Sequence, residues 1–273
     1  VIDATTGRPA LDNLGREIKD WNPGSIIYRM ENMPKDPRID NALKVTHDAR
    51  IAALDFRLVD PHAPDDEGSK VNEAVRRIHK IWEENTYRKG TQLVFCDLST
   101  PKGKFTARPN NDAETEVAAP EDSFSMDEIL GESIDPDKFS VYADMRQKLI
   151  DLGIPANEIK FIHDATNDQK RQELFRSVNN GDVRILIGST SKMGAGTNVQ
   201  RRLVALHDLD CPWRPRDLEQ RHGRGIRQGN MFFEQDKENF ELEICCYATE
   251  RTYDARMWQT IEVKARGIEQ FRN

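Results

Sequence analysis

The chain has 273 residues and a formal net charge of −7, and 32% of its residues are charged while only 7% are aromatic. This length is enough to bury a sizeable core. The negative charge excludes a nucleic-acid-binding protein that relies on bulk electrostatic attraction, so any contact with nucleic acid must be local. No apolar run approaches the roughly 18 residues of a membrane-spanning helix, and we expect no membrane association.

Residues 1–68 are rich in Pro, Asp and Arg and show little periodicity, apart from a predicted helix near Arg38–Ala53. We therefore expect a partly helical lead-in segment at 1–68 and a folded domain at 69–273. Apolar residues recur at three- and four-residue steps over Lys70–Asn85, which predicts an amphipathic helix. The apolar run Gln92–Asp97 follows it and is typical of a buried parallel strand.

An acidic insertion from about 101 to 138 interrupts this domain. Ten acidic residues and no basic residue lie between Asp112 and Asp137, together with prolines and few apolar residues. Such a composition does not support a core of its own, so we expect an inserted loop.

Strands and helices alternate after the insertion. In chain order the predicted elements are helix Val141–Leu152, strand Ile159–His163, helix Asp168–Asn179, strand Val183–Gly188, strand Leu203–His207, helix Pro215–His222, strand Leu242–Tyr247 and a long helix from Arg251 to about Arg266. This alternation predicts a three-layer α/β domain, in which helices cover both faces of a central, mainly parallel sheet. The last strand and helix form a C-terminal extension.

The segment Gln220–Gly229 has the residue types expected of an anion site. It places Gln220, Gly223, Arg224 and Arg227 in the order Q-x-x-G-R-x-x-R. Arg224 and Arg227 are three positions apart, so on a helical turn they lie on one face and can converge on one polyanion. Guanidinium groups stay charged and present a rigid fork of donors, which suits a phosphoryl group in transfer. A solvated, arginine-rich helix start is the alternative.

A second segment suited to phosphate lies upstream. The predicted strand that ends at Gly188 runs into Ser189–Asn198, where small hydroxyl residues and glycines would present backbone N–H groups to phosphates. An ordinary strand-to-helix turn is the alternative. Because ligands bind at the carboxyl ends of parallel strands, two such loops on neighbouring elements favour one shared phosphate site.

Several motifs follow one another in a recognisable order. They are Ser189-Thr190 with Gly194-x-Gly196-x-Asn198, then Trp213-x-Pro215, then Gln220-x-x-Gly223-Arg224-x-x-Arg227, then the tail Tyr247–Tyr253 with its helix. In this order they resemble the second motor domain of superfamily 2 helicases and translocases, in particular the Swi/Snf-type branch. More narrowly, the chain is similar to helicase-like proteins of phages and conjugative elements, which are often joined to an adenine methylase. The resemblance covers about 70–273 and implies a RecA-like fold.

The resemblance implies a role for each matched residue on the nucleotide side. Arg224 and Arg227 would be arginine fingers that reach the ATP held by another domain, and Gln220 would align them. The residues implied to face the nucleotide cleft and to couple it to the DNA track are Gly194, Gly196 and Asn198.

On the nucleic-acid side the resemblance implies contacts with the phosphodiester backbone, which position DNA without reading its sequence. The residues implied are Ser99, Ser189, Thr190 and Lys192. For Ser99 and Lys192 an ordinary solvated loop residue is an equally good interpretation.

The chain shows no P-loop of the form G-x-x-x-x-G-K-[ST] and no carboxylate placed to hold Mg²⁺ in a motor. We therefore expect half of an ATP-dependent DNA helicase or translocase, inactive by itself. ATP and Mg²⁺ would be held mainly by an upstream P-loop domain of the same polypeptide. The other expected partners are DNA, with duplex DNA favoured, and a fused or adjacent DNA methylase.

Two other functions stay open. Asp210-Cys-Pro-Trp213 is one residue away from the D-P-P-[YFW] box of DNA adenine methyltransferases, although no glycine-rich turn for S-adenosylmethionine precedes it. A docking module that keeps the motor fold without its chemistry is the other alternative. The four cysteines form no C-x-x-C pair, so we expect neither a disulfide nor a metal site and favour a cytoplasmic location.

Overall fold

The computed structural model describes residues 25–100, 139–194 and 198–272. The chain divides into two compact units, Val1–Arg50 and Ile51–Asn273, and each is described by itself. The predicted acidic insertion lies outside the described residues. The predicted domain boundary near residue 68 remains a prediction.

The described part of the first unit is helical. Helix α1 spans Ile26–Glu31, and helix α2 spans Ala42–Leu54 and continues past the division between the units. Ser25 begins α1, since its side-chain oxygen accepts a hydrogen bond from the backbone N–H of Tyr28 at 3.2 Å. The predicted helix near Arg38–Ala53 corresponds to α2.

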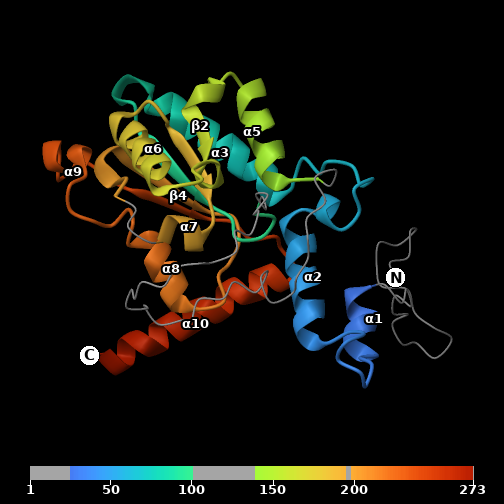
Figure 1. Ribbon diagram of the computed structural model, residues 1–273. Helices are drawn as coiled ribbons and strands as arrows, with labels where there is room; N and C mark the ends of the chain where they lie inside the picture. Colours follow the sequence, from blue (N-terminus) through green and yellow to red (C-terminus); the bar gives the residue numbers. More distant parts are fainter. Residues whose placement is uncertain (1–24, 101–138, 195–197, 273) are drawn as a thin grey trace, which may run out of the picture. The chain divides into compact units, whose positions relative to one another are not determined.

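The second unit alternates helices and strands (Figure 1). Its strands are β1 (Thr91–Phe95), β2 (Ile159–Phe161), β3 (Ile185–Gly188), β4 (Leu203–Asp208) and β5 (Glu243–Cys246). Its α-helices are α3 (Lys70–Glu84), α5 (Val141–Asp151), α6 (Asp168–Asn180), α7 (Thr190–Gly194), α8 (Pro215–His222), α9 (Met231–Gln235) and α10 (Tyr253–Arg272). Short 3₁₀ helices span Phe56–Leu58, Thr86–Arg88, Ala156–Glu158, Ile162–Asp164 and Gln200–Arg202.

The five strands form one sheet in the order β2-β3-β1-β4-β5, and every strand pair among the described residues is parallel. In the centre, Val94 of β1 lies opposite Ile187 of β3 on one side and His207 of β4 on the other. The predicted α/β fold class is therefore confirmed. An all-parallel sheet brings the carboxyl ends of all its strands to one edge, where ligands of such folds bind.

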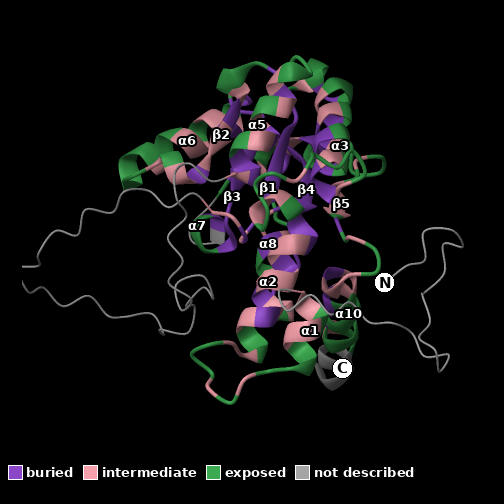
Figure 2. Ribbon diagram, turned by 90° about the vertical axis from the view of Figure 1, so that its right-hand side faces the viewer, coloured by how far each residue is buried: buried purple, intermediate pink, exposed green. Residues whose placement is uncertain are grey.

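Alternate residues of the central strand enter two different cores. Val94 and Cys96 belong to a cluster with α3 and α5, whereas Leu93 and Phe95 belong to a cluster with α6 and α7. This alternation follows from the two-residue period of a strand. Helices thus cover both faces of the sheet, and the three central strands, β1, β3 and β4, are the most buried part of the unit (Figure 2).

Side-chain caps explain where the covering helices begin. Ser69 precedes α3 and accepts a hydrogen bond from the N–H of Asn72 at 3.2 Å, and Asn167 precedes α6 and accepts one from Lys170 at 2.8 Å. Helix α6 ends at Gly181, which has a φ of +79° that favours glycine.

The structure differs from the predicted elements mainly at element ends and in short helices. The predicted strand Ile159–His163 ends at Phe161, because a 3₁₀ turn begins there. The long last helix begins at Tyr253 rather than Arg251, since Arg251 has a positive φ of 59° that no helix accepts. Within the described ranges, no helix is both long and apolar enough to cross a bilayer.

A series of buried side-chain hydrogen bonds crosses the sheet at His207. Its Nε2 lies 2.9 Å from Oε1 of Gln92, and its Nδ1 lies 2.8 Å from the hydroxyl of Tyr247. The amide nitrogen of Gln92 donates to the carbonyl of Ile78, so Oε1 faces the ring and Nε2 must carry the hydrogen. Burial lowers the pKa of His207 to about 4, and the ring is therefore neutral at pH 7.

We expect His207 to make folding stability depend on pH between about 6.5 and 4. The unfolded chain protonates this histidine near pH 6.5, whereas the folded chain does not until about pH 4. Its contribution is complete above pH 6.5 and is lost as the pH falls, which amounts to about 3 kcal/mol at pH 4. Urea unfolding of the wild type and of His207→Gln at several pH values measures this contribution of His207 to stability.

The difference in unfolding free energy between the wild type and His207→Gln should shrink as the pH falls from about 6.5 to 4. His62→Gln is the matched control, because His62 is exposed and its substitution should leave the pH dependence unchanged. Parallel pH profiles for the wild type and His207→Gln would contradict a neutral, buried His207.

Candidate functional site

Polar residues gather where three neighbouring strands end. Asp97 follows β1, Thr190 follows β3, and Asp208 and Asp210 lie at and after the end of β4. These strands are adjacent in the order β3-β1-β4, so their carboxyl ends meet at one edge of the sheet. The carboxylate of Asp97 accepts hydrogen bonds from the backbone N–H of Thr190 at 2.6 Å and from its hydroxyl at 2.7 Å.

Arg221, the second-last residue of α8, lies among these groups and is fully buried, with an exposed fraction of 0%. Its Nε donates to Oγ1 of Thr190 at 2.7 Å. One terminal nitrogen donates to the carboxylate of Asp208 at 3.0 Å and the carbonyl of Asp210 at 2.8 Å. The other donates to the carboxylates of Asp97 at 2.7 Å and Asp210 at 2.8 Å. All five N–H groups of the guanidinium are therefore used.

Opposite charges favour the charged forms of Arg221 and Asp97. Burial by itself would lower the pKa of Arg221, but Asp97, Asp210 and Asp208 raise it well above its ordinary value. Burial also opposes ionisation of Asp97, yet Arg221 and the hydrogen bonds from Thr190 outweigh it and lower the pKa of this carboxyl. Because every donor of Arg221 is engaged inside the protein, Arg221 is a structural cation rather than a ligand-binding group.

His222 and Cys246 extend the network at Asp208. Nε2 of His222 lies 2.7 Å from Oδ2 of Asp208, and the thiol of Cys246 donates to the same oxygen at 3.8 Å. The three ligand atoms lie within 4.8 Å of one another, close enough for a metal ion. However, desolvation of the sulfur and the charge of Asp208 raise the pKa of the Cys246 thiol to about 12, and Arg221 already holds the other oxygen of Asp208. The cluster is better described as a set of hydrogen bonds.

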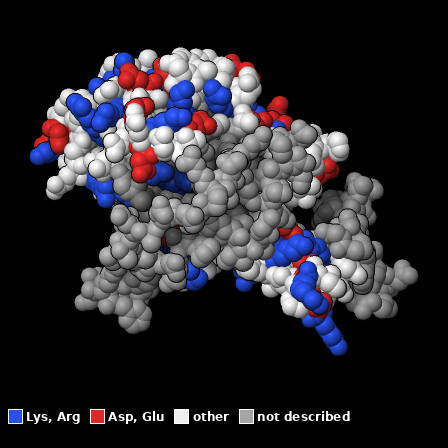
Figure 3. All heavy atoms as spheres, viewed as in Figure 1, with Lys and Arg blue, Asp and Glu red and all other residues white. Residues whose placement is uncertain are grey.

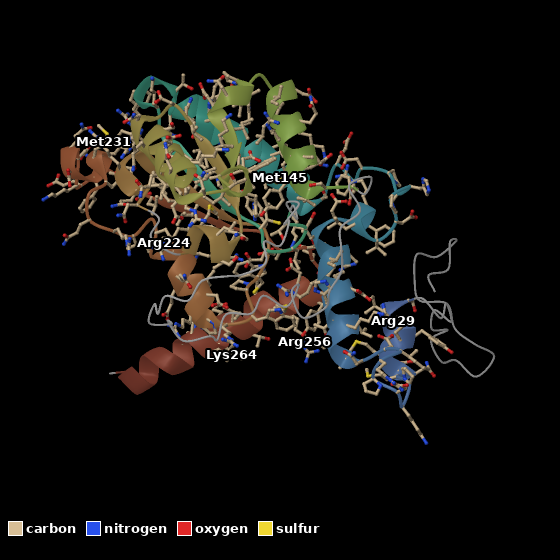
Figure 4. The ribbon with its side chains drawn as sticks, in the orientation of Figure 1. Arg29, Met145, Arg224, Met231, Arg256 and Lys264 are labelled. Carbon is tan, nitrogen blue, oxygen red and sulfur yellow. The ribbon has the colours of Figure 1, made fainter. Side chains whose placement is uncertain are left out.

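The two predicted arginine fingers follow α8 directly. Helix α8 begins with Pro215 at its first turn and ends at His222, as predicted. The turn continues helically, since the N–H groups of Gly225 and Ile226 both donate to the carbonyl of His222 at 2.9 Å. Arg224 is partly exposed and lies close to the sheet (Figure 4), whereas Arg227 is exposed.

Gly225 lets this turn approach the sheet. A Cβ at this position would lie 2.7 Å from Leu242 and 2.9 Å from Leu206, so a side chain would push the turn outward. Burial lowers the pKa of Arg224, and the nearby positive charge of Arg227 lowers it further. Two like charges held near each other form a site that favours an anion.

The structure brings the two predicted phosphate loops together. A terminal nitrogen of Arg227 donates to Oδ1 of Asn198 at 3.1 Å, which joins residues 29 positions apart in the sequence. The carbonyl of Asn198 accepts a hydrogen bond from Asn179 at 2.6 Å, which ties it to α6. Gln220 is exposed on α8. Gly194 is the last residue of α7, and Gly196 lies outside the described residues.

The residues predicted to contact DNA occupy different environments. Ser99 has a positive φ of 63°, and its hydroxyl accepts from the N–H of Val141 at 3.4 Å. Lys192 is exposed on α7, while Ser189 is buried and its hydroxyl lies 3.2 Å from that of Ser191. The hydroxyl of Thr190 is already shared by Asp97 and Arg221. Lys192 is thus the most accessible of the four predicted contacts.

Sequence reasoning missed the centre of the site. Arg221 lies inside the Q-x-x-G-R-x-x-R motif at a position that the motif leaves unspecified. His222, inside the same motif, contacts Asp208. The signal that could have revealed them is the aspartates at the ends of two predicted strands, since buried carboxylates at one edge of a sheet require a cation.

Asp210 also bears on the methyltransferase alternative. Its carboxylate accepts hydrogen bonds from the backbone N–H groups of Asp97 at 2.5 Å and Leu98 at 2.8 Å, and from Arg221. The side chain is 1% exposed. An aspartate that is buried and engaged in this way is not placed to hold the amine of a target base.

One known protein family matches part of the chain. Residues 125–229 match the family described as the helicase conserved C-terminal domain. The matched segment contains most of the site, including Thr190, Asp208, Asp210 and Arg221, and both predicted arginine fingers. A comparison with curated protein sequences gives no significant match.

Several solved structures resemble part of this chain in the path of the backbone. The C-terminal part of the Fun30 ATPase domain is 15% identical with a TM-score of 0.43, over 87% of this chain and 61% of that one. The helicase MrfA bound to DNA and AMPPNP is 14% identical with a TM-score of 0.40, over 70% and 20%. A DEAD box protein from Methanococcus jannaschii is 15% identical with a TM-score of 0.38, over 69% and 36%. Such partial likenesses assign no activity to this chain, which spans less than two thirds of each of these proteins.

Proposed function

We propose that the chain contains the second motor domain of an ATP-dependent DNA helicase or translocase of superfamily 2, on the Swi/Snf-like branch. The contact between Arg227 and Asn198 carries this proposal. It unites two segments that the sequence separately suggested for phosphate binding, at the carboxyl edge of a parallel sheet. The match of residues 125–229 to the helicase C-terminal family supports the same assignment.

Arg224 and Arg227 suit the triphosphate of ATP. Two neighbouring cations held by a turn beside the sheet can donate hydrogen bonds to a transferring phosphoryl group and stabilise its negative charge. Gln220, exposed in the last turn of α8, is proposed to align this pair, and Asn198 holds Arg227 in place. Bound ATP supplies the phosphoryl group, and an upstream P-loop domain of the same polypeptide would hold it together with Mg²⁺.

The nucleic-acid partner is proposed to be DNA, with duplex DNA favoured, at the segment that follows β3. Lys192 is exposed there, and short polar groups next to it suit a phosphodiester backbone. On the described part of the face shown in Figure 3, Lys and Arg side chains are intermixed with Asp and Glu, which fits local rather than bulk attraction. We also propose a fused or adjacent DNA methylase as a partner and the cytoplasm as the location of the protein.

The test compares DNA-stimulated ATP hydrolysis by the longer polypeptide, which includes its upstream P-loop domain, with and without Arg227→Ala. We expect the substitution to reduce the turnover number by about a thousandfold, since arginine fingers contribute this much or more to phosphoryl transfer. The 273-residue chain alone should show no turnover.

Arg176→Ala is the matched control, because Arg176 is exposed on α6 and no role is proposed for it. This variant should hydrolyse ATP at the wild-type rate. Equal rates for the wild type and Arg227→Ala, with correct folding of both, would refute the arginine-finger assignment.

A further inference from the structure

The guanidinium of Arg221 holds together segments that are far apart in the sequence. Its acceptors are Asp97 after β1, Thr190 after β3, and Asp208 and Asp210 at and after the end of β4. These are the three neighbouring strands at the centre of the sheet. Arg221 itself belongs to α8, so one side chain joins three strand ends to this helix.

The hydrogen-bond network of Arg221 contacts both halves of the proposed site, the DNA side at α7 and the nucleotide side after α8. Thr190 is the first residue of α7, which carries Lys192 on the proposed DNA side. Arg221 precedes by three positions the first of the two arginines on the proposed nucleotide side, and the N–H of Arg224 donates to the carbonyl of Arg221 at 3.1 Å. Thus a single hydrogen bond, from Nε of Arg221 to the hydroxyl of Thr190 at 2.7 Å, connects the two halves directly.

The connection is rigid rather than adaptable. Thr190 is fixed by three hydrogen bonds, two to Asp97 and one from Arg221, and Arg221 has no free donor. Arg221, Thr190, Asp208 and Asp210 are buried and only Asp97 is partly exposed, so water does not readily replace the bond between Arg221 and Thr190. A displacement of the start of α7 must therefore displace Arg221 or break a buried, charge-assisted hydrogen bond.

We propose that Arg221 is a positioning residue that transmits DNA binding at α7 to the arginine pair after α8. The inference rests on the proposed motor function and adds to it the route by which DNA would stimulate ATP hydrolysis. Arg221 touches neither ligand, because all of its donors are used within the protein. Its effect is on where Arg224 and Arg227 lie when DNA is bound.

The experiment measures ATP hydrolysis by the longer polypeptide at saturating DNA for Arg221→Lys and Thr190→Val. Lysine has three donors on one nitrogen and does not reproduce five bonds, while valine removes only the hydroxyl that joins the two halves. In both variants we expect the DNA-stimulated kcat to fall about tenfold or more, because small misplacements of catalytic groups are costly. The KM for ATP should change far less.

Control residues lie at the other end of the strands, where their amino ends meet. Arg184 precedes β3, is 3% exposed, and donates to Thr86 Oγ1 at 3.1 Å and to two backbone carbonyls. Arg184→Lys and Thr86→Val therefore break an arginine–threonine bond away from the site, although Thr86 is exposed and Thr190 is buried. Arg184→Lys should lower the melting temperature, and both variants should leave the DNA-stimulated kcat unchanged.

The outcomes separate this inference from the proposed function. If Arg227→Ala abolishes turnover but Arg221→Lys and Thr190→Val keep the full DNA-stimulated kcat, Arg221 does not couple the two halves and the motor assignment stands. If Thr190→Val raises only the DNA concentration that gives half-maximal rate, Thr190 is a DNA contact and the coupling is refuted. If the wild type shows no DNA-stimulated hydrolysis, both proposals fail.

Discussion

Replacing Arg221 with methionine is expected to lower the free energy of unfolding by about 3 to 5 kcal/mol. The substitution removes the cation but leaves Asp208 and Asp210 in place, with side chains that are 0% and 1% exposed. Buried carboxylates that lose their cation cost more than the ion pair itself contributes. Urea unfolding of the 273-residue chain, followed by circular dichroism, measures the difference.

A compensated variant gives the control for this prediction. Adding Asp208→Asn and Asp210→Asn to Arg221→Met removes both buried negative charges and should recover part of the lost stability. The three changes are expected to be non-additive, because the groups share one network. A loss below about 1 kcal/mol for Arg221→Met alone, typical of a surface position, would mean that the site is hydrated rather than buried.

Replacing Lys70 with methionine should cost a similar amount, about 3 to 5 kcal/mol, at a different place in the fold. Nζ of Lys70 lies 2.7 Å from Oδ2 of Asp254, and the two side chains are 3% and 4% exposed. The same oxygen accepts a hydrogen bond from the N–H of Thr249 at 3.2 Å. This pair fastens the start of α10 to the start of α3, so its loss should also increase hydrogen exchange at the start of α10.

The same helix offers a matched control for Lys70. Lys80 pairs with Glu84 at 3.8 Å, but these side chains are 61% and 56% exposed. Lys80→Met should therefore change stability by no more than about 0.5 kcal/mol. If both lysine variants had equally small effects, the Lys70–Asp254 pair would be contributing no more than a surface ion pair.

Much of the fold could be predicted from periodicity. The helix over Lys70–Asn85 and the helix Pro215–His222 were predicted within one residue, because each carries a clear apolar pattern or a clear start signal. Helices α1, α7 and α9 have only six, five and five residues, too few for periodicity to appear. The order of the strands follows from packing and is not encoded in any local pattern.

The candidate site was predictable only in part. The sequence placed Arg227 and Asn198 in two separate motifs, and the structure brings them into contact. It gave no indication that Thr190 would bond to Asp97 and Arg221, because those residues lie 93 and 31 positions away. Contacts of this kind depend on strand order, which only the folded chain shows.

The short outer strands of the sheet have a consequence for solubility. The two edges are β2, with three residues, and β5, with four residues including the charged Glu243. Exposed edge strands recruit other chains by backbone pairing, and short or charged edges resist this. The sheet therefore offers little template for edge-to-edge aggregation, which suits a domain whose central parallel strands are fully buried.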